Sequence, residues 1–348
     1  MIDIIQEYFS KKGKKFCHHL TENVKALMKS GAANTYSMAR ELSRMNGKSF
    51  KTNEMAVYRF LQDDKFQIDD KFWRCHINII FESLKANNMI EEGQLIQVNI
   101  DYTAHEDNFL ILAASIMLAD KAITIYFSSR KYPKKKGDIS YKKMEEGFIK
   151  GLRHVLSKKY KYVIVADRGF GNQRFAGLCK ENGFDYVLRI NCNLNIRNDE
   201  MIRSLKDKTE NERFEAMVVN WKEKYKFTIA STEGSIWYLI SSNSELDAKA
   251  IYEKRFKIEK NFQDCKSNGY DIEKSKIRKY ERFKRMMYLI VLGHALTTIT
   301  RYVINKSANS IKKFLREGKH KAKTNLSIFR VGYEALQLYF TESINRLK

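Results

Sequence analysis

Three carboxylates stand at positions where a metal-dependent reaction would need them. Asp101 directly continues the apolar run at 95–100, and Asp167 directly follows the apolar run at 162–166. Glu259 lies further along, in the charged segment IYEKRFKIEKNFQDCK at 251–266. A carboxylate cluster must be neutralised, and Mg²⁺ or Mn²⁺ is the natural partner of an all-oxygen site. Two such ions, about 3.5–4 Å apart, activate water or a 3′-hydroxyl and stabilise the leaving oxygen of phosphoryl transfer.

Each of these residues also has a simpler interpretation. An aspartate at the end of a strand often only caps a turn or a helix. His105, Glu106 and Asp107 follow Asp101 closely and are alternative ligands. We favour Asp101 because it directly continues the apolar run. The combination of two aspartates after apolar strands with a later glutamate favours a metal site over three unrelated caps.

The segment at 251–266 predicts a helix with two distinct sides. At about 100° per residue, its polar residues fall on one narrow stripe and its apolar residues on the neighbouring stripe. The polar stripe consists of Tyr252, Arg255, Glu259, Gln263 and Lys266, and the apolar stripe of Ile251, Ile258, Phe262 and Cys265. Such a polar face is more often a set of salt bridges than a catalytic surface. Here the apolar stripe is expected to dock on a sheet, so that Glu259 faces the two aspartates.

The apolar runs of the central region predict the sheet that would position these carboxylates. Alternating and continuous apolar stretches favour strands, and a spacing near 3.6 residues favours helices. The expected strands are 94–104, 108–119, 122–132, 161–171 and 184–190, and the expected helices are 140–158 and 172–183. The order β-β-β-α-β-α-β is typical of a ribonuclease-H-like α/β fold, a mixed sheet flanked by helices. Its first and fourth strands are neighbours, which would bring Asp101 and Asp167 together.

The regions around this core predict further domains. We expect a helical DNA-binding domain at 1–88, the two parts of the catalytic core at 89–192 and 246–305, a β-rich insertion at 193–245, and a helical C-terminal region at 306–348. Helices at 36–45 and 52–61, joined by a Gly-containing break, suggest a helix-turn-helix. The second helix offers Asn53, Tyr58 and Arg59 for DNA contacts, although a plain helical bundle fits the same pattern.

Composition favours a folded, nucleic-acid-binding protein. The 348 residues are 43% hydrophobic and carry a net charge of +23, which points to a polyanionic partner, although coding bias toward lysine accounts for part of the charge. The five cysteines show no CxxC spacing and suggest a reducing, cytoplasmic location. The apolar run at 286–300 contains His294 and several threonines, which favours a core helix over a membrane span. Gly47-Lys48-Ser49 lacks the glycine five residues upstream that a nucleotide-binding loop requires, so no nucleotide cofactor is expected.

The motifs together resemble the DDE transposases of bacterial insertion sequences, of the IS-four type. The resemblance rests on NIDYT around Asp101, ADRGFGN around Asp167 and, above all, the pattern Y-x2-R-x3-E-x6-K in the segment 251–266. It covers roughly residues 36–340. It implies cut-and-paste transposition of double-stranded DNA by a homodimer that pairs two transposon ends and joins them to target DNA.

The resemblance also implies roles for single residues. Asp101, Asp167 and Glu259 would be the catalytic ligands of two Mg²⁺ ions, which Mn²⁺ can replace. The patterned residues Tyr252, Arg255 and Lys266 would hold DNA phosphates.

Cleavage would pass through a hairpin on the transposon end, with an aromatic residue stacked on a displaced base. Trp237 is the candidate, with Trp221 behind it, although both also fit the core of the insertion. Arg168 either contacts DNA or braces the sheet. Two other functions remain open: a ribonuclease-H-like nuclease without strand transfer, and a catalytically inactive DNA-binding repressor.

Overall fold

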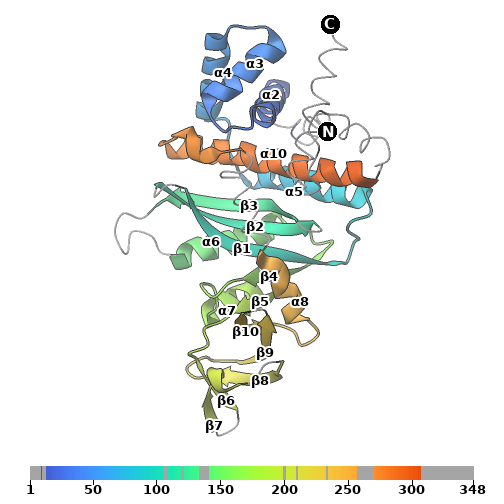
Figure 1. The fold of residues 1–348 in the computed structure, drawn as a ribbon, viewed down its shortest axis with the longest axis vertical. Coiled ribbons are helices and arrows are strands. Elements are labelled where there is room, and N and C mark those ends of the chain that lie inside the picture. Colours follow the sequence, from blue (N-terminus) through green and yellow to red (C-terminus); the bar gives the residue numbers. More distant parts are fainter. Residues whose placement is uncertain are drawn as a thin grey trace.

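The described strands form one ten-stranded mixed sheet that runs from the middle of the molecule to its lower end (Figure 1). The computed structural model describes residues 9, 13–105, 108–118, 121–132, 141–198, 201–208, 211–232, 234–256 and 270–306. The strands lie in the order β3-β2-β1-β4-β5-β10-β9-β8-β6-β7. The first five are β1 (Leu95–His105), β2 (Phe109–Leu118), β3 (Lys121–Lys131), β4 (Lys161–Ala166) and β5 (Asp185–Arg189).

The first five strands pair as the sequence predicts. β1, β2 and β3 form an antiparallel meander, and β4 and β5 are added in parallel on the other side of β1. Helix α6 (Tyr141–Val155) connects β3 to β4, and helix α7 (Gln173–Glu181) connects β4 to β5. This mixed sheet with flanking helices is compatible with a ribonuclease-H-like fold, and β1 and β4 are neighbours as expected.

Residues 193–245 extend the same sheet. They contain β6 (Asn195–Asn198), β7 (Met201–Ser204), β8 (Arg213–Val218), β9 (Lys224–Thr232) and β10 (Ser235–Ser241). β10 pairs antiparallel with β5, which makes the sheet continuous from β3 to β7. The segment is β-rich as predicted, but its boundary as a separate domain stays a prediction.

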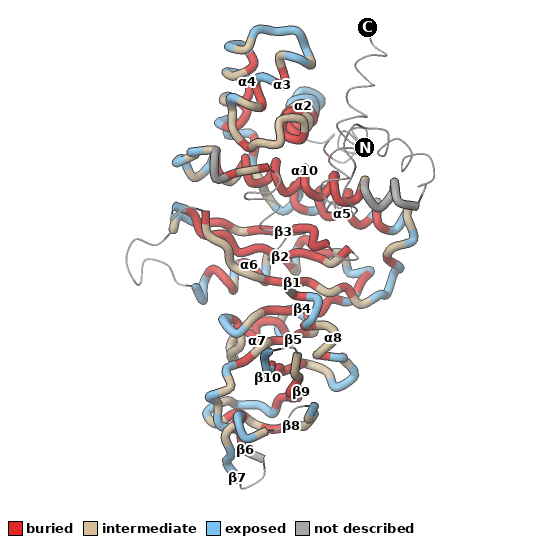
Figure 2. The backbone as a smooth tube through the Cα atoms, in the orientation of Figure 1, coloured by how far each residue is buried: buried red, intermediate tan, exposed pale blue. Residues whose placement is uncertain are grey.

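Helix α10 (Tyr280–Lys306) is a buried core helix. Residues 286–298 are all buried, because the helix lies between the sheet and the N-terminal helices (Figure 2). Tyr288 packs its ring edge-on against Phe72 at 4.5 Å and against Trp73 at 5.6 Å, both on helix α5 (Asp70–Ala86). No helix in the described part of the chain has the length and apolar character needed to cross a bilayer.

Helix α5 ties the N-terminal segment to the sheet. Trp73 packs against Tyr126 and Phe127 of β3, with ring centroids 5.1 Å apart in both pairs. The predicted helical segment at 1–88 is therefore helical in its described part, but its last helix belongs to the packing of the central sheet. The domain boundary at residue 88 stays a prediction.

The predicted helix-turn-helix corresponds to α3 (Thr35–Asn46) and α4 (Phe50–Gln62). Gly47 ends α3 in the left-handed region, at φ 69°, and the Ser49 side chain caps α4 by accepting the N–H of Thr52. Helix α2 (Lys14–Ser30) packs against α3 and α10. The three helices stack on the side of α10 that faces away from the sheet (Figure 1).

The expected DNA-contacting residues of α4 need correction. Asn53 is buried, and its amide donates to the Ser43 hydroxyl at 3.1 Å and the Asn46 side-chain oxygen at 3.1 Å, so it braces the turn. Tyr58 accepts a hydrogen bond from Arg282 of α10 at 2.6 Å. Of the three predicted residues, only Arg59 is exposed.

Candidate carboxylate site

The register between β1 and β4 places Asp101 and Asp167 next to each other. Ile100, in the middle of β1, is paired with Ala166, the last residue of β4, and each aspartate is the following residue. Asp101 accepts the N–H of Tyr102 at 2.8 Å, and Asp167 accepts the N–H of Gly169 at 2.8 Å. These local bonds orient both carboxylates at one edge of the sheet.

The environment of Asp101 disfavours its charge. Burial raises the pKa of Asp101 to about 6, and the negative charge of Asp167 adds to this rise. The Arg255 guanidinium opposes it, because Arg255 donates to the Asp101 carboxylate at 3.1 Å. The Arg255 side chain is itself 5% exposed, so this ion pair is largely shielded from water.

Arg255 reaches the site from the segment that was predicted to face the aspartates. The described part of that segment consists of helix α8 (Ala248–Glu253) and a 3₁₀ turn, Lys254–Phe256. Residues 257–269, which include Glu259, Gln263 and Lys266, lie outside the described residues. Of the alternative ligands, Glu106 and Asp107 also lie outside them, whereas His105 is buried and stacks on Phe283 at 5.1 Å.

Tyr252 and Trp237 form part of the packing beneath Arg255. Tyr252 is fully buried and meets Trp237 of β10 edge-on, with ring centroids 5.0 Å apart. Arg255 lies over the Tyr252 ring at 5.6 Å. The helical-wheel analysis placed Tyr252 on the polar stripe and Ile251 on the docking stripe; instead Tyr252 is the buried contact and Ile251 is half-buried. The reason is that a tyrosine ring is amphipathic and buries well when its hydroxyl lies near cations.

The side chains of Trp237, Trp221 and Arg168 differ in how exposed they are. The Trp237 indole is only 4% exposed, so stacking on a displaced base would require it to leave the packing against Tyr252. Trp221 is half-buried and packs edge-on against Tyr225 at 4.9 Å. Arg168, which directly follows Asp167, is exposed, and its role stays a prediction.

The loop ADRGFGN after β4 is held by close packing. Gly171 lies against β5, and a Cβ at this position would come within 2.0 Å of the Arg189 carbonyl oxygen. Phe170 stacks on Tyr102 of β1, with ring centroids 5.2 Å apart and an interplanar angle of 7°. Residues close to Asp101 and Asp167 in the sequence therefore pack against each other.

Arg189 is a residue that sequence reasoning missed. It ends β5, and its positive charge, together with that of Arg255, lowers the pKa of the Tyr252 hydroxyl against the larger, opposite effect of burial. Its position at the end of the strand next to β4 was the available signal. It adds a second cation on the Asp167 side of the site.

The donor chemistry of Asp101 and Asp167 fits a hard divalent cation. Two neighbouring carboxylates, one of them half-buried with a raised pKa, gain stability when a cation neutralises them. Within the described residues no group of three or more His, Cys, Asp or Glu side chains lies close enough to hold an ion. The third predicted ligand, Glu259, is not among those residues.

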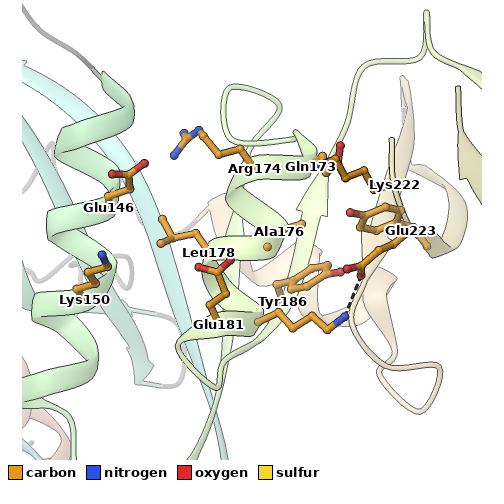
Figure 3. A pocket seen from close by; sticks show the side chains of 13 residues that line it. Glu146, Lys150, Gln173, Arg174, Ala176, Leu178, Glu181, Tyr186, Lys222 and Glu223 are labelled. Atoms are coloured by element: carbon orange, nitrogen blue, oxygen red, sulfur yellow. Dashed lines mark hydrogen bonds and ion pairs between the residues drawn. The ribbon is translucent and has the colours of Figure 1, made fainter. Parts of the chain in front are cut away.

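A separate cleft of about 590 Å³ lies between α6, α7 and the β8–β9 turn (Figure 3). Basic and acidic side chains line it together, and Lys180 forms an ion pair with Glu223 at 2.8 Å. Because its charges largely cancel, this cleft does not favour an anionic or a cationic ligand.

A protein-family model matches the central region of the chain. Residues 131–296 match the model of a family described as "Transposase DDE domain", a stretch that contains Asp167 and Glu259 and begins after Asp101. No curated protein matches the chain. The crystal structure of Marinitoga piezophila Argonaute, in complex with a 5′-OH guide RNA and target DNA, is 10% identical and has a TM-score of 0.22. That match covers 57% of this chain and 31% of the Argonaute chain. The family match over residues 131–296 supports a DDE transposase, an enzyme that acts on DNA.

Proposed function

We propose that the chain is the transposase of an insertion sequence, which binds terminal inverted repeats and catalyses metal-dependent DNA cleavage and strand transfer. The observation that carries this proposal is the pairing of Ile100 with Ala166, which sets Asp101 and Asp167 side by side. Arg255, four residues before Glu259 in the sequence, contacts Asp101 at 3.1 Å, so the described start of the segment 251–266 reaches the same site.

In this proposal Asp101, Asp167 and Glu259 hold two Mg²⁺ ions, with Mn²⁺ as a substitute. When bound, the ions would activate the attacking water or 3′-hydroxyl and stabilise the leaving oxygen. The chain itself positions the carboxylates through the Tyr102 and Gly169 N–H groups and leaves the Asp101 side chain 19% exposed. A hard cation binds the ionised carboxylate, so metal binding must draw Asp101 away from its protonated form.

The remaining residues of the motif would bind the DNA backbone. A planar guanidinium can donate to two oxygens at once, so Arg255 suits a phosphate near the scissile bond. Lys266 would supply a second cation, and the exposed Arg168 a third, beside Asp167. Tyr252 would act mainly by supporting Arg255 from below, given its burial.

The finer features of the reaction extend this proposal. They are a hairpin intermediate, a homodimer that pairs two ends, and a stacking role for Trp237, all of which the resemblance to IS-four transposases implies. The Trp237 role requires the indole to leave its packing against Tyr252, which is expected only in the DNA complex.

The test uses labelled DNA from the gene's own flanks, purified protein and Mg²⁺. Glu259→Gln removes one carboxylate, and Glu253→Gln, an exposed glutamate on α8, is its matched control. We expect breaks at one defined end, with hairpin or joined products, from wild type and Glu253→Gln but not from Glu259→Gln. Scattered cutting without joined products would favour a nuclease, and binding without cutting in all three proteins would favour a DNA-binding repressor.

A further inference from the structure

A strongly basic hollow lies where the helix-turn-helix meets the start of α10. It has a volume of about 310 Å³ and is bounded by Thr35 at the start of α3, by Tyr58 and Leu61 of α4, and by residues 275–279 and 282. It therefore joins the N-terminal helices to the segment that leads into the central core helix. It is separate from Asp101 and Asp167, neither of which lines it.

The side chains that line this hollow carry charge of one sign. Lys276, Arg278, Lys279 and Arg282 are basic, and none of the described lining residues is acidic. Lys276, Arg278 and Lys279 are exposed, and none of the three has an ion-pair partner among the described residues. Four cations around one concavity repel each other and concentrate a positive potential there, which favours an anionic ligand.

Arg282 is held in position for such a ligand. Its guanidinium lies over the Tyr58 ring at 4.1 Å and donates to the Tyr58 hydroxyl at 2.6 Å. Its Nε atom is buried and has no hydrogen-bond partner within the described part of the chain. A buried N–H of a guanidinium is costly when unsatisfied, so an acceptor oxygen in the hollow would complete its hydrogen bonds.

We propose that this hollow binds a backbone phosphate of the DNA at the transposon end (the end DNA), at the junction between the helix-turn-helix and α10. The inference rests on the proposed function and adds the residues that anchor the DNA away from the carboxylates. Contacts of this kind set the position of the protein on the duplex without reading its sequence.

The test compares two double variants that remove the same charge. Arg278→Gln/Lys279→Gln alters the hollow, and Lys158→Gln/Lys161→Gln alters two exposed lysines before and at the start of β4. Binding to end DNA and to unrelated DNA is measured over a series of salt concentrations.

The hollow variant should bind both DNAs on the order of tenfold more weakly. The magnitude of the slope of log affinity against log salt should fall by about 1, because one phosphate contact is lost and each contributes about 1. The control should change neither quantity appreciably. An unchanged salt slope in the hollow variant, or an equal loss in both variants, would overturn the proposal.

Two further arms separate related outcomes. Inorganic phosphate, added at constant ionic strength, should not raise the melting temperature of wild type by more than it raises that of the hollow variant. If it does while DNA binding is unchanged, the hollow takes a small free anion and the DNA assignment is wrong. Cleavage of the transposon end with Mg²⁺ is measured in parallel. If wild type cleaves and the hollow variant shows no binding defect, the proposal that the hollow binds DNA is wrong, and the proposed transposase function stands. A binding defect in the variant without cleavage by wild type refutes the transposase alone.

Discussion

The ion pair between Asp101 and Arg255 links the carboxylate site to the segment that carries Glu259. Arg255 compensates part of the cost of burying Asp101, and it lies on the Tyr252 ring, which in turn packs on Trp237. A chain of contacts therefore runs from β10 through α8 and the turn that follows it to the middle of β1. Because this pair is shielded from water, its protonation state affects the stability of the metal-free protein.

The pH dependence of stability should reveal the raised pKa of Asp101. The folded protein holds the proton up to about pH 6, whereas an ordinary aspartate releases it near 3.8. Between these values the folded state binds more protons than the unfolded state, so the unfolding free energy falls as pH rises from about 4 to 6. The loss is on the order of 3 kcal/mol and is then constant at higher pH.

Urea unfolding of metal-free wild type and Asp101→Asn at pH 4.5 and pH 7 measures this effect. The stability of wild type relative to the variant should be greater at pH 4.5 than at pH 7, because the asparagine has no proton to lose. An equal difference at both pH values would contradict a raised pKa at Asp101.

Residue types alone predicted which side chains to examine, but not which of them would be buried. Asp101 and Asp167 follow apolar runs, and their adjacency followed from the expected strand order. Tyr252 and Asn53 were misplaced, because a helical period gives the angular position of a side chain but not which neighbouring element covers it. In both cases a contact distant in sequence, or a tight turn, decides the burial.

At the level of single elements, the loop after β4 depends on the absence of a side chain at Gly171. Gly171→Ala should cost more than about 3 kcal/mol of stability, since the new Cβ would meet the β5 backbone at 2.0 Å. Gly177→Ala on α7 is the control: nothing lies within 4 Å of its Cβ position, so it should be neutral or stabilising by up to about 1 kcal/mol. Chemical denaturation measures both, and equal stabilities would show that the loop does not need this close approach.

The turn between α3 and α4 should respond to substitution differently from the exposed side of α4. Asn53→Ala removes the amide that bonds Ser43 and Asn46, and should cost about 1–3 kcal/mol of stability. Lys51→Ala changes an exposed residue of the same helix and should alter stability by less than about 0.5 kcal/mol while weakening DNA binding. Thermal unfolding and a DNA-binding titration check both expectations. If Lys51→Ala lost much stability and Asn53→Ala did not, the assignment of Asn53 as the residue that stabilises the turn would be wrong.

The strands of the central sheet were predictable because each is a short apolar run bounded by turn residues. The continuation of the sheet through β10 was not, because β5 and β10 are separated by four further strands in sequence. Local periodicity carries no information about such a pairing. The packing of α5 on β3 was missed for the same reason, since an apolar helical face does not specify its partner.

For the whole molecule, Arg285 connects the N-terminal helices to the central core. From α10 it donates to the carbonyl oxygens of Leu61 and Phe66, each at 3.0 Å, while its side chain is 6% exposed. Arg285→Met would leave these two carbonyls without their donor and should cost about 2–4 kcal/mol. Lys284→Met, one residue earlier on α10, should cost much less. Thermal unfolding of the two variants tests this. Equal melting temperatures would show that Arg285 does not hold the N-terminal helices on the central core.

The most direct measurement of the central claim is a double-mutant cycle on end cleavage. The assay uses Mg²⁺ and labelled DNA from the transposon end, and compares Asp101→Asn, Asp167→Asn and the combined variant. The control is Asp185→Asn, at the first residue of β5, which is paired with Val163 and not with the end of β4. If Asp101 and Asp167 form one metal site, each single variant loses cleavage by several orders of magnitude, the double variant is no worse, and DNA binding and the Asp185 control are retained. Independent losses that multiply in the double variant, or substantial cleavage by either single variant, would contradict a shared site.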